Sequence, residues 1–122
     1  MAKTIAKILG LVLLLVGILG FTAVLKPLGA HLNPAHNAVH ILTGVIALYF
    51  GFAQTMSAAR AFDLVFGAVY LLLGVCGYFL GDAGNMHMLH IGPLMLGNMD
   101  HMIHVAVGAL FLIGGLMTGK NA

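Results

Sequence analysis

Four long stretches without Asp, Glu, Lys or Arg constrain this chain more than any other feature. They run over residues 8–25, 38–59, 64–81 and 102–119. About 20 residues of α-helix, rising 1.5 Å each, cross a hydrocarbon core of roughly 30 Å. All four stretches are near this length, so we predict transmembrane helices over about 4–25, 34–56, 60–81 and 100–119. These helices fill nearly the whole chain, and residues 1–122 are therefore expected to form a single transmembrane domain.

The composition agrees with a membrane protein. The 122 residues are 61% hydrophobic and only 7% charged, and the mean hydropathy is +1.10. A soluble domain of this size needs a mostly polar surface, because small domains have much surface for their volume. The net charge of +2 is also too sparse for a nucleic-acid interface. The sequence therefore predicts an all-α membrane protein, a four-transmembrane-helix bundle whose partner is the lipid bilayer and not a nucleic acid.

The basic residues lie mostly on one side of the predicted membrane. The chain ends and the link between the second and third helices hold Lys3, Lys7, Arg60 and Lys120, whereas the first long loop holds Lys26. Cytoplasmic segments carry an excess of Lys and Arg. We therefore expect a multi-pass protein with both termini in the cytoplasm and with the loops at 26–37 and 82–100 on the outer side.

The two halves of the chain match each other. In the first and third helices, glycines with the same spacing precede an aromatic residue. Gly10, Gly17, Gly20 and Phe21 match Gly67, Gly74, Gly77 and Tyr78. In the second and fourth helices, Asn37, His40, Gly44, Gly51 and Gln54 match His101, His104, Gly108, Gly115 and Thr118. This pattern predicts a tandem duplicated helical hairpin, with repeat 1 at about 1–57 and repeat 2 at about 58–122, related by a pseudo-twofold axis along the membrane normal. The first helix is then a permanent span rather than a signal peptide.

Small and polar residues share one face of the matched helices. At about 100° per residue, His40, Gly44 and Gly51 lie within roughly 40° of one another. Membrane helices associate through small residues that let their backbones approach. We expect helix packing at Gly10, Gly17, Gly44, Gly51, Gly67, Gly74, Gly108 and Gly115. Clearance for a flat cofactor beside Gly44 and Gly108 is the alternative.

All seven histidines fall on the outward side: His31, His36, His40, His87, His90, His101 and His104. His36 with His40 is an i, i+4 pair and His101 with His104 an i, i+3 pair, so each pair can present two nitrogens on one helix face. One interpretation is that His40 and His104 hydrogen-bond neighbouring helices. The other is a site for a transition metal, or for haem b held between His40 and His104, aided by His36 and His101.

The outward loop before the fourth helix combines histidine with methionine. His87 and His90 lie among Met86, Met88, Met95, Met99 and Met102. Thioether and imidazole ligands together suit copper, particularly Cu(I). Weaker metal candidates are therefore His87, His90, Met86, Met88, Met99 and Met102, whereas a solvated loop and ordinary apolar methionines explain the same residues without a metal.

Polar residues near the helix ends have structural interpretations. Arg60 and Asp63 are spaced i, i+3 and are expected to form an interfacial ion pair, with a proton or ion relay as the alternative. Asn33 and Pro34 are typical of an N-cap and a first helical residue, and Asn98 or Asp100 can cap the fourth helix in the same way. We expect Asn37, Arg60, Asp63 and Asp100 to be structural polar residues.

Several of these segments resemble a family of small bacterial four-helix membrane proteins, domain of unknown function 4383. The likeness covers most of the chain. It rests on residues 6–10, 17–21 and 36–40 with Gly44, then on Arg60, residues 66–70 with Gly74 and Gly77, and on Asp100, His104 and Gly108. His36-Asn37-Ala38-Val39-His40 is its most specific element. The resemblance implies the same fold and topology in a bacterial inner membrane, and it implies no activity. The chain departs from the family pattern at His101 and in the Met-rich loop.

Three functions remain open from the sequence. The chain has no nucleophile with a base, no paired carboxylates and no phosphate loop, so we do not expect an enzyme. The leading hypothesis is a non-enzymatic accessory or scaffolding subunit, either a homo-oligomer or part of a larger membrane complex. The alternatives are an electron-transfer or copper-handling protein that binds metal or haem, and an oligomeric ion or metal channel.

Overall fold

The computed structural model describes residues 1–22, 34–85, 87–91 and 94–119. It contains four helices and one short antiparallel hairpin: α1 (Ala2–Leu19), α2 (Pro34–Phe52), α3 (Met56–Leu80), β1 (Leu89–Ile91), β2 (Leu94–Leu96) and α4 (Asn98–Leu116). Each helix is long and apolar enough to cross a membrane. The predicted all-α fold, a bundle of four transmembrane helices, is confirmed. The candidate residues Met86 and His31 lie outside the described residues.

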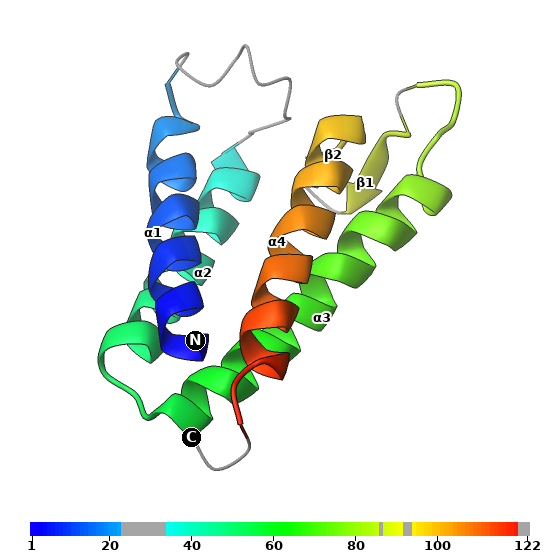
Figure 1. Cartoon of the computed structure of the whole chain (residues 1–122). Coiled ribbons are helices and arrows are strands. Elements are labelled where there is room, and N and C mark those ends of the chain that lie inside the picture. Colours follow the sequence, from blue (N-terminus) through cyan, green and yellow to red (C-terminus); the bar gives the residue numbers. More distant parts are fainter. Residues whose placement is uncertain (23–33, 86, 92–93, 120–122) are drawn as a thin grey trace.

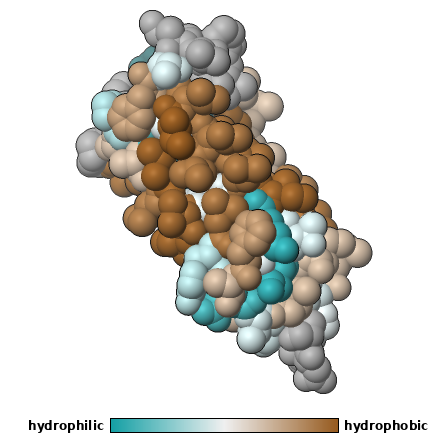
Figure 2. All heavy atoms as spheres, turned by 90° about the vertical axis from the view of Figure 1, so that its left-hand side faces the viewer, coloured by the Kyte–Doolittle hydropathy of each residue, from teal (hydrophilic) through white to brown (hydrophobic). Residues whose placement is uncertain are grey.

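The helices pack as two hairpins, α1 with α2 and α3 with α4 (Figure 1). The start of α1, the α2–α3 link and the end of α4 lie at one end of the bundle, and the start of α2, the start of α4 and the β-hairpin lie at the other. Figure 2 shows hydrophobic side chains gathered over the middle of the face where α1 and α2 lie, with hydrophilic residues towards one end. Large apolar side chains such as Leu42, Leu72 and Phe79 are exposed on the helices, as expected for surfaces that meet lipid.

The glycines predicted for packing lie where the two helices of each hairpin touch. A Cβ added to Gly10 in α1 would lie 3.0 Å from the carbonyl oxygen of Gly44 in α2, and one added to Gly44 would lie 2.6 Å from the Leu14 amide nitrogen. In the second hairpin, a Cβ on Gly67 would lie 3.0 Å from the carbonyl oxygen of Gly108. The same matched positions therefore meet in both hairpins. The duplication itself stays a prediction from the sequence.

Replacing Gly108 by Ala is expected to destabilise the second hairpin. The added Cβ would meet backbone atoms of Leu71 and Gly67, which cannot rotate away as a side-chain end can. Overpacking of this kind costs about 1–3 kcal/mol, so thermal unfolding in detergent should begin at a lower temperature. Gly119→Ala is the matched control, because nothing lies within 4 Å of its added Cβ. Equal melting temperatures for the two variants would contradict this packing.

An aromatic layer joins the two hairpins in the middle of the bundle. The Phe62 ring of α3 stacks on Phe50 of α2 at 4.8 Å between centroids and contacts Phe111 of α4 at 5.7 Å. Phe111 in turn lies 6.4 Å from the ring of Tyr70. Phe111 is fully buried, and Phe62 and Tyr70 are 5% exposed. This layer closes the bundle interior on one side of the histidines described below.

The predicted ion pair between Arg60 and Asp63 is wrong. The Arg60 Nε donates to the carbonyl oxygen of Thr118 at the end of α4, at 2.9 Å. Asp63 is fully buried in α3, and neither of its oxygens has a hydrogen-bond partner within the described part of the chain. Helical spacing allows the two side chains to meet, but the end of α4 provides Arg60 with a closer acceptor.

The start of α4 also differs from the predicted caps. Gly97 is the N-cap residue, and Asn98 is already helical. Asp100 lies in the first turn, where its Oδ2 accepts a hydrogen bond from the Gly97 amide at 2.8 Å. The carboxylate therefore satisfies one of the free N–H groups at this helix end. Pro34 begins α2 as predicted, and Asn33 lies outside the described residues.

Candidate metal centre

Three histidines from two helices converge at the end of the bundle that holds the β-hairpin. His36 and His40 lie in the first two turns of α2, and His104 lies in the second turn of α4. The ring centroids of His36 and His40 are 4.2 Å apart, and those of His40 and His104 are 6.5 Å apart. One ring nitrogen from each residue falls within 4.8 Å of the others. The i, i+4 spacing on α2 places its two imidazoles on one face, and the packing of the hairpins brings His104 opposite them.

The three imidazoles are buried together. His36, His40 and His104 are 3%, 4% and 2% exposed. Nδ1 of His40 and Nδ1 of His104 have no hydrogen-bond partner among the described residues. Buried polar atoms are nearly always paired with protein or water, so these two nitrogens are in position to accept a ligand.

The spacing of the triad is close to that of a metal site. Two nitrogens bound to one tetrahedral ion at about 2.0–2.1 Å lie about 3.3 Å apart. The nitrogens here lie within 4.8 Å, so a contraction of about 1.5 Å at most is needed. Rotation of the imidazoles about their side-chain bonds supplies a movement of this size without moving the helices.

The triad borders a cavity of about 200 Å³ between the hairpins. Its walls are mostly apolar, and the polar groups besides the histidines are the hydroxyls of Thr43 and Tyr70. These two hydroxyls lie within side-chain hydrogen-bonding reach of each other, and the Tyr70 ring centroid is 5.6 Å from that of His104. The lining residues are His36, Val39, His40, Thr43, Phe66, Val69, Tyr70, Leu73, Leu96 and His104.

One carboxylate balances charge beside the triad. Asp100 is 1% exposed, and its charge acts on both His40 and His104. In the predicted repeat, Asp100 occupies the position equivalent to His36, just as His104 is equivalent to His40. A buried negative charge beside the triad favours a cation between the imidazoles, because the surrounding dielectric is low.

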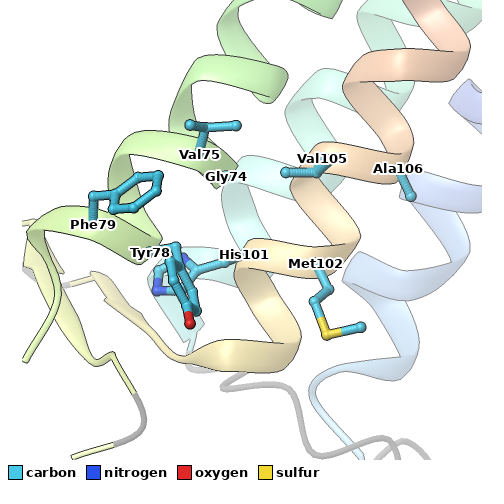
Figure 3. A pocket seen from close by; sticks show the side chains of 8 residues that line it. All are labelled: Gly74, Val75, Tyr78, Phe79, His101, Met102, Val105 and Ala106. Atoms are coloured by element: carbon cyan, nitrogen blue, oxygen red, sulfur yellow. The ribbon is translucent and has the colours of Figure 1, made fainter. Parts of the chain in front are cut away.

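His101 does not join the triad. Its Nε2 donates to the carbonyl oxygen of His87 at 2.7 Å, and its ring faces Gly77 of α3, where an added Cβ would lie 2.7 Å from Nδ1. Figure 3 shows His101 extending from α4 towards α3 beside Tyr78, at a groove between these helices. Gly77 provides the space for this ring, so His101 contributes to helix packing and not to the cavity.

The other loop candidates also lie away from the triad. The His87 ring stacks on Tyr78 at 3.8 Å, and its Nδ1 donates to the carbonyl oxygen of Tyr78 at 2.9 Å. His90 is exposed on β1. Met88 is buried, Met99 is partly buried and Met102 is exposed, and no methionine is among the described residues that line the cavity. The described residues therefore offer three nitrogen ligands and no thioether.

A haem between His40 and His104 does not fit this arrangement. The His36 ring lies 4.2 Å from His40 and 5.7 Å from His104, so it borders the space that a porphyrin would cross. The cavity of about 200 Å³ is also smaller than the roughly 300 Å³ at which pockets for organic ligands begin. Gly44 and Gly108 receive the backbones of α1 and α3 and leave no slot for a flat cofactor.

Thr43 and Tyr70 belong to the site, although the motifs in the sequence do not point to them. In the predicted repeat they match Val107 and Leu13. Each position is thus polar in one copy and apolar in the other. Such mismatches between two otherwise equivalent helices are the signal that identifies these residues.

Comparison with known proteins finds one family. Residues 3–117 match the family described as "Domain of unknown function (DUF4383)". No curated protein and no solved structure matches the chain.

Proposed function

The chain belongs to the DUF4383 family, whose description names no activity, and we propose from the site itself that this membrane protein binds a divalent transition metal. The observation that carries the proposal is the convergence of His36, His40 and His104, all buried, with ring nitrogens within 4.8 Å. Ionisable residues inside membrane bundles are costly and usually mark ion or ligand sites. Burying three imidazoles costs free energy, and packing between two helices does not require three such polar side chains.

The ligand set favours borderline ions. Imidazole suits Zn²⁺, Cu²⁺, Ni²⁺ and Fe²⁺, whereas Cu(I) prefers sulfur ligands. The described residues of the site supply imidazole nitrogen ligands and no sulfur ligand, so Zn²⁺ is the first ion to test. The nearby carboxylate of Asp100 reduces the charge that the bundle interior must accommodate.

The surroundings favour a binding site over a pore. The aromatic layer of Phe62, Phe111 and Tyr70 lies between the triad and the other end of the bundle. Apolar rings packed in this way disfavour the passage of an ion through the described part of the bundle. By the distribution of basic residues, the triad faces the outer side and both termini face the cytoplasm. The accessory role, and assembly with a second copy or another subunit, stay predictions.

The test is a titration of protein purified in detergent and stripped of metal. We expect Zn²⁺ to bind with one equivalent per chain, measured by calorimetry and by elemental analysis after desalting. The double variant His40→Ala/His104→Ala should bind none while keeping its helical circular dichroism. A wild-type chain that binds no Zn²⁺, Cu²⁺, Ni²⁺ or Co²⁺ would refute the proposal, and so would a double variant that still binds one equivalent.

A further inference from the structure

The cavity beside the three histidines contains more space and fewer ligands than a structural metal site needs. Structural zinc sites are closed by four protein ligands, whereas sites that bind exogenous ligands keep one position open. Of the described residues that line the cavity, only the three histidines carry nitrogen ligands, and the remaining polar side chains are those of Thr43 and Tyr70. Neutral hydroxyls are weak ligands for a borderline ion. The fourth position therefore has no strong protein ligand among the described residues.

The volume of the cavity limits what can take this position. A water molecule occupies about 30 Å³ in the liquid, and the cavity measures about 200 Å³. There is room for water or for an anion of a few atoms. Val39, Phe66 and Leu96 are among the apolar walls, so a larger polar ligand would lose its hydration without replacement.

The charges select an anion. A divalent ion with three neutral imidazoles carries two positive charges, and Asp100 is the carboxylate that acts on His40 and His104. One positive charge is left over. In an apolar cavity, a charge without a partner is costly, and a monoanion bound to the metal removes that cost.

Resting on the proposed metal binding, we infer that the metal held by His36, His40 and His104 takes a small monoanion from solution as its fourth ligand, within hydrogen-bonding reach of the Tyr70 hydroxyl. The ligand class is hydroxide or a small inorganic anion such as azide. Tyr70 is a positioning residue here, because its ring lies against His104, it lines the cavity together with Thr43, and its hydroxyl interacts with that of Thr43.

The experiment uses the full chain loaded with Co²⁺, whose visible d–d absorption reports its ligands. Addition of azide is expected to change this spectrum saturably, with one azide per cobalt, whereas benzoate is expected to cause no change because of its size. Cobalt that binds stoichiometrically but shows no spectral response to azide would overturn this inference and leave the metal site standing. Absence of cobalt binding would refute the proposed function itself.

Two variants separate the contributions to anion binding. Tyr70→Phe should weaken azide binding about tenfold, and by more than it weakens cobalt binding, since it removes one hydrogen bond to a charged ligand. Tyr49→Phe is the control, because Tyr49 is exposed and its hydroxyl accepts from Gln54 at 2.6 Å.

Asp100→Asn keeps an oxygen for the Gly97 amide but removes the charge, so azide should bind more tightly while cobalt binds more weakly. Changes in the same direction for both ligands would contradict the charge argument.

Discussion

Replacing His104 by Ala is expected to weaken Zn²⁺ binding by more than about 100-fold. Loss of a group that merely orients a metal ligand costs 10–100-fold in affinity, and His104 is the single imidazole that α4 contributes to the triad. Its removal leaves two nitrogens on α2 and a buried ion without a ligand on the opposite hairpin. Competition against a chelator of known affinity, on detergent-solubilised protein, measures the change.

The same experiment should divide the six described histidines into two groups. His36→Ala and His40→Ala should act like His104→Ala, because all three rings face one another. His90→Ala should leave the affinity unchanged, since His90 is exposed on β1. His101→Asn is the stringent control. In the predicted repeat, position 101 matches position 37, which is Asn and which also faces a glycine, Gly20. If His101→Asn weakens binding as much as His104→Ala does, the assignment of the triad is wrong.

Bound Zn²⁺ is expected to raise the melting temperature on the order of 10 °C. The triad takes two ligands from the first hairpin and one from the second, so the ion ties the two hairpins together. A ligand that binds only the native state at 1,000 times its Kd contributes about 4 kcal/mol, and each kcal/mol shifts the melting temperature of a chain of this size by several degrees. Thermal unfolding followed by circular dichroism, with and without Zn²⁺, measures the shift.

Two comparisons test the origin of that stabilisation. A chelator should return the melting temperature to that of the metal-free protein, and His104→Ala should show a much smaller rise with Zn²⁺. Gly108→Ala should unfold at a lower temperature yet retain the full rise, because its contact lies within the second hairpin. A similar rise in His104→Ala would show that Zn²⁺ stabilises the protein elsewhere.

Most of the fold follows from the sequence because lipid imposes a simple requirement. A spanning segment must be apolar and about 20 residues long, and the four uncharged stretches meet that requirement without ambiguity. The glycine spacing likewise locates the contacts within each hairpin, since only glycine allows a carbonyl oxygen as close as that of Gly44 to Gly10. The short β-hairpin before α4 was not predicted, because three-residue strands leave too little alternation to recognise.

The site follows from the sequence only in part. The pairing of His40 with His104 is visible in the matched helices, but the choice between His36 and His101 as a third ligand depends on which way each ring turns. His101 turns into the space above Gly77, and His36 turns towards the cavity. That difference arises from the contact of the His101 ring with α3, and the spacing of residues within α4 does not predict this contact. Thr43 and Tyr70 enter the site through packing between hairpins, and no local motif marks such contacts.

X-ray absorption spectroscopy of the Zn²⁺-loaded protein tests the central claim most directly, because it counts and identifies the metal ligands. We predict a four-coordinate ion with three imidazole nitrogens at about 2.0–2.1 Å and one further light atom, and the loss of one imidazole contribution in His104→Ala. A shell of sulfur at about 2.3 Å, or a six-coordinate oxygen shell with fewer than two imidazoles, would contradict a metal site built from His36, His40 and His104.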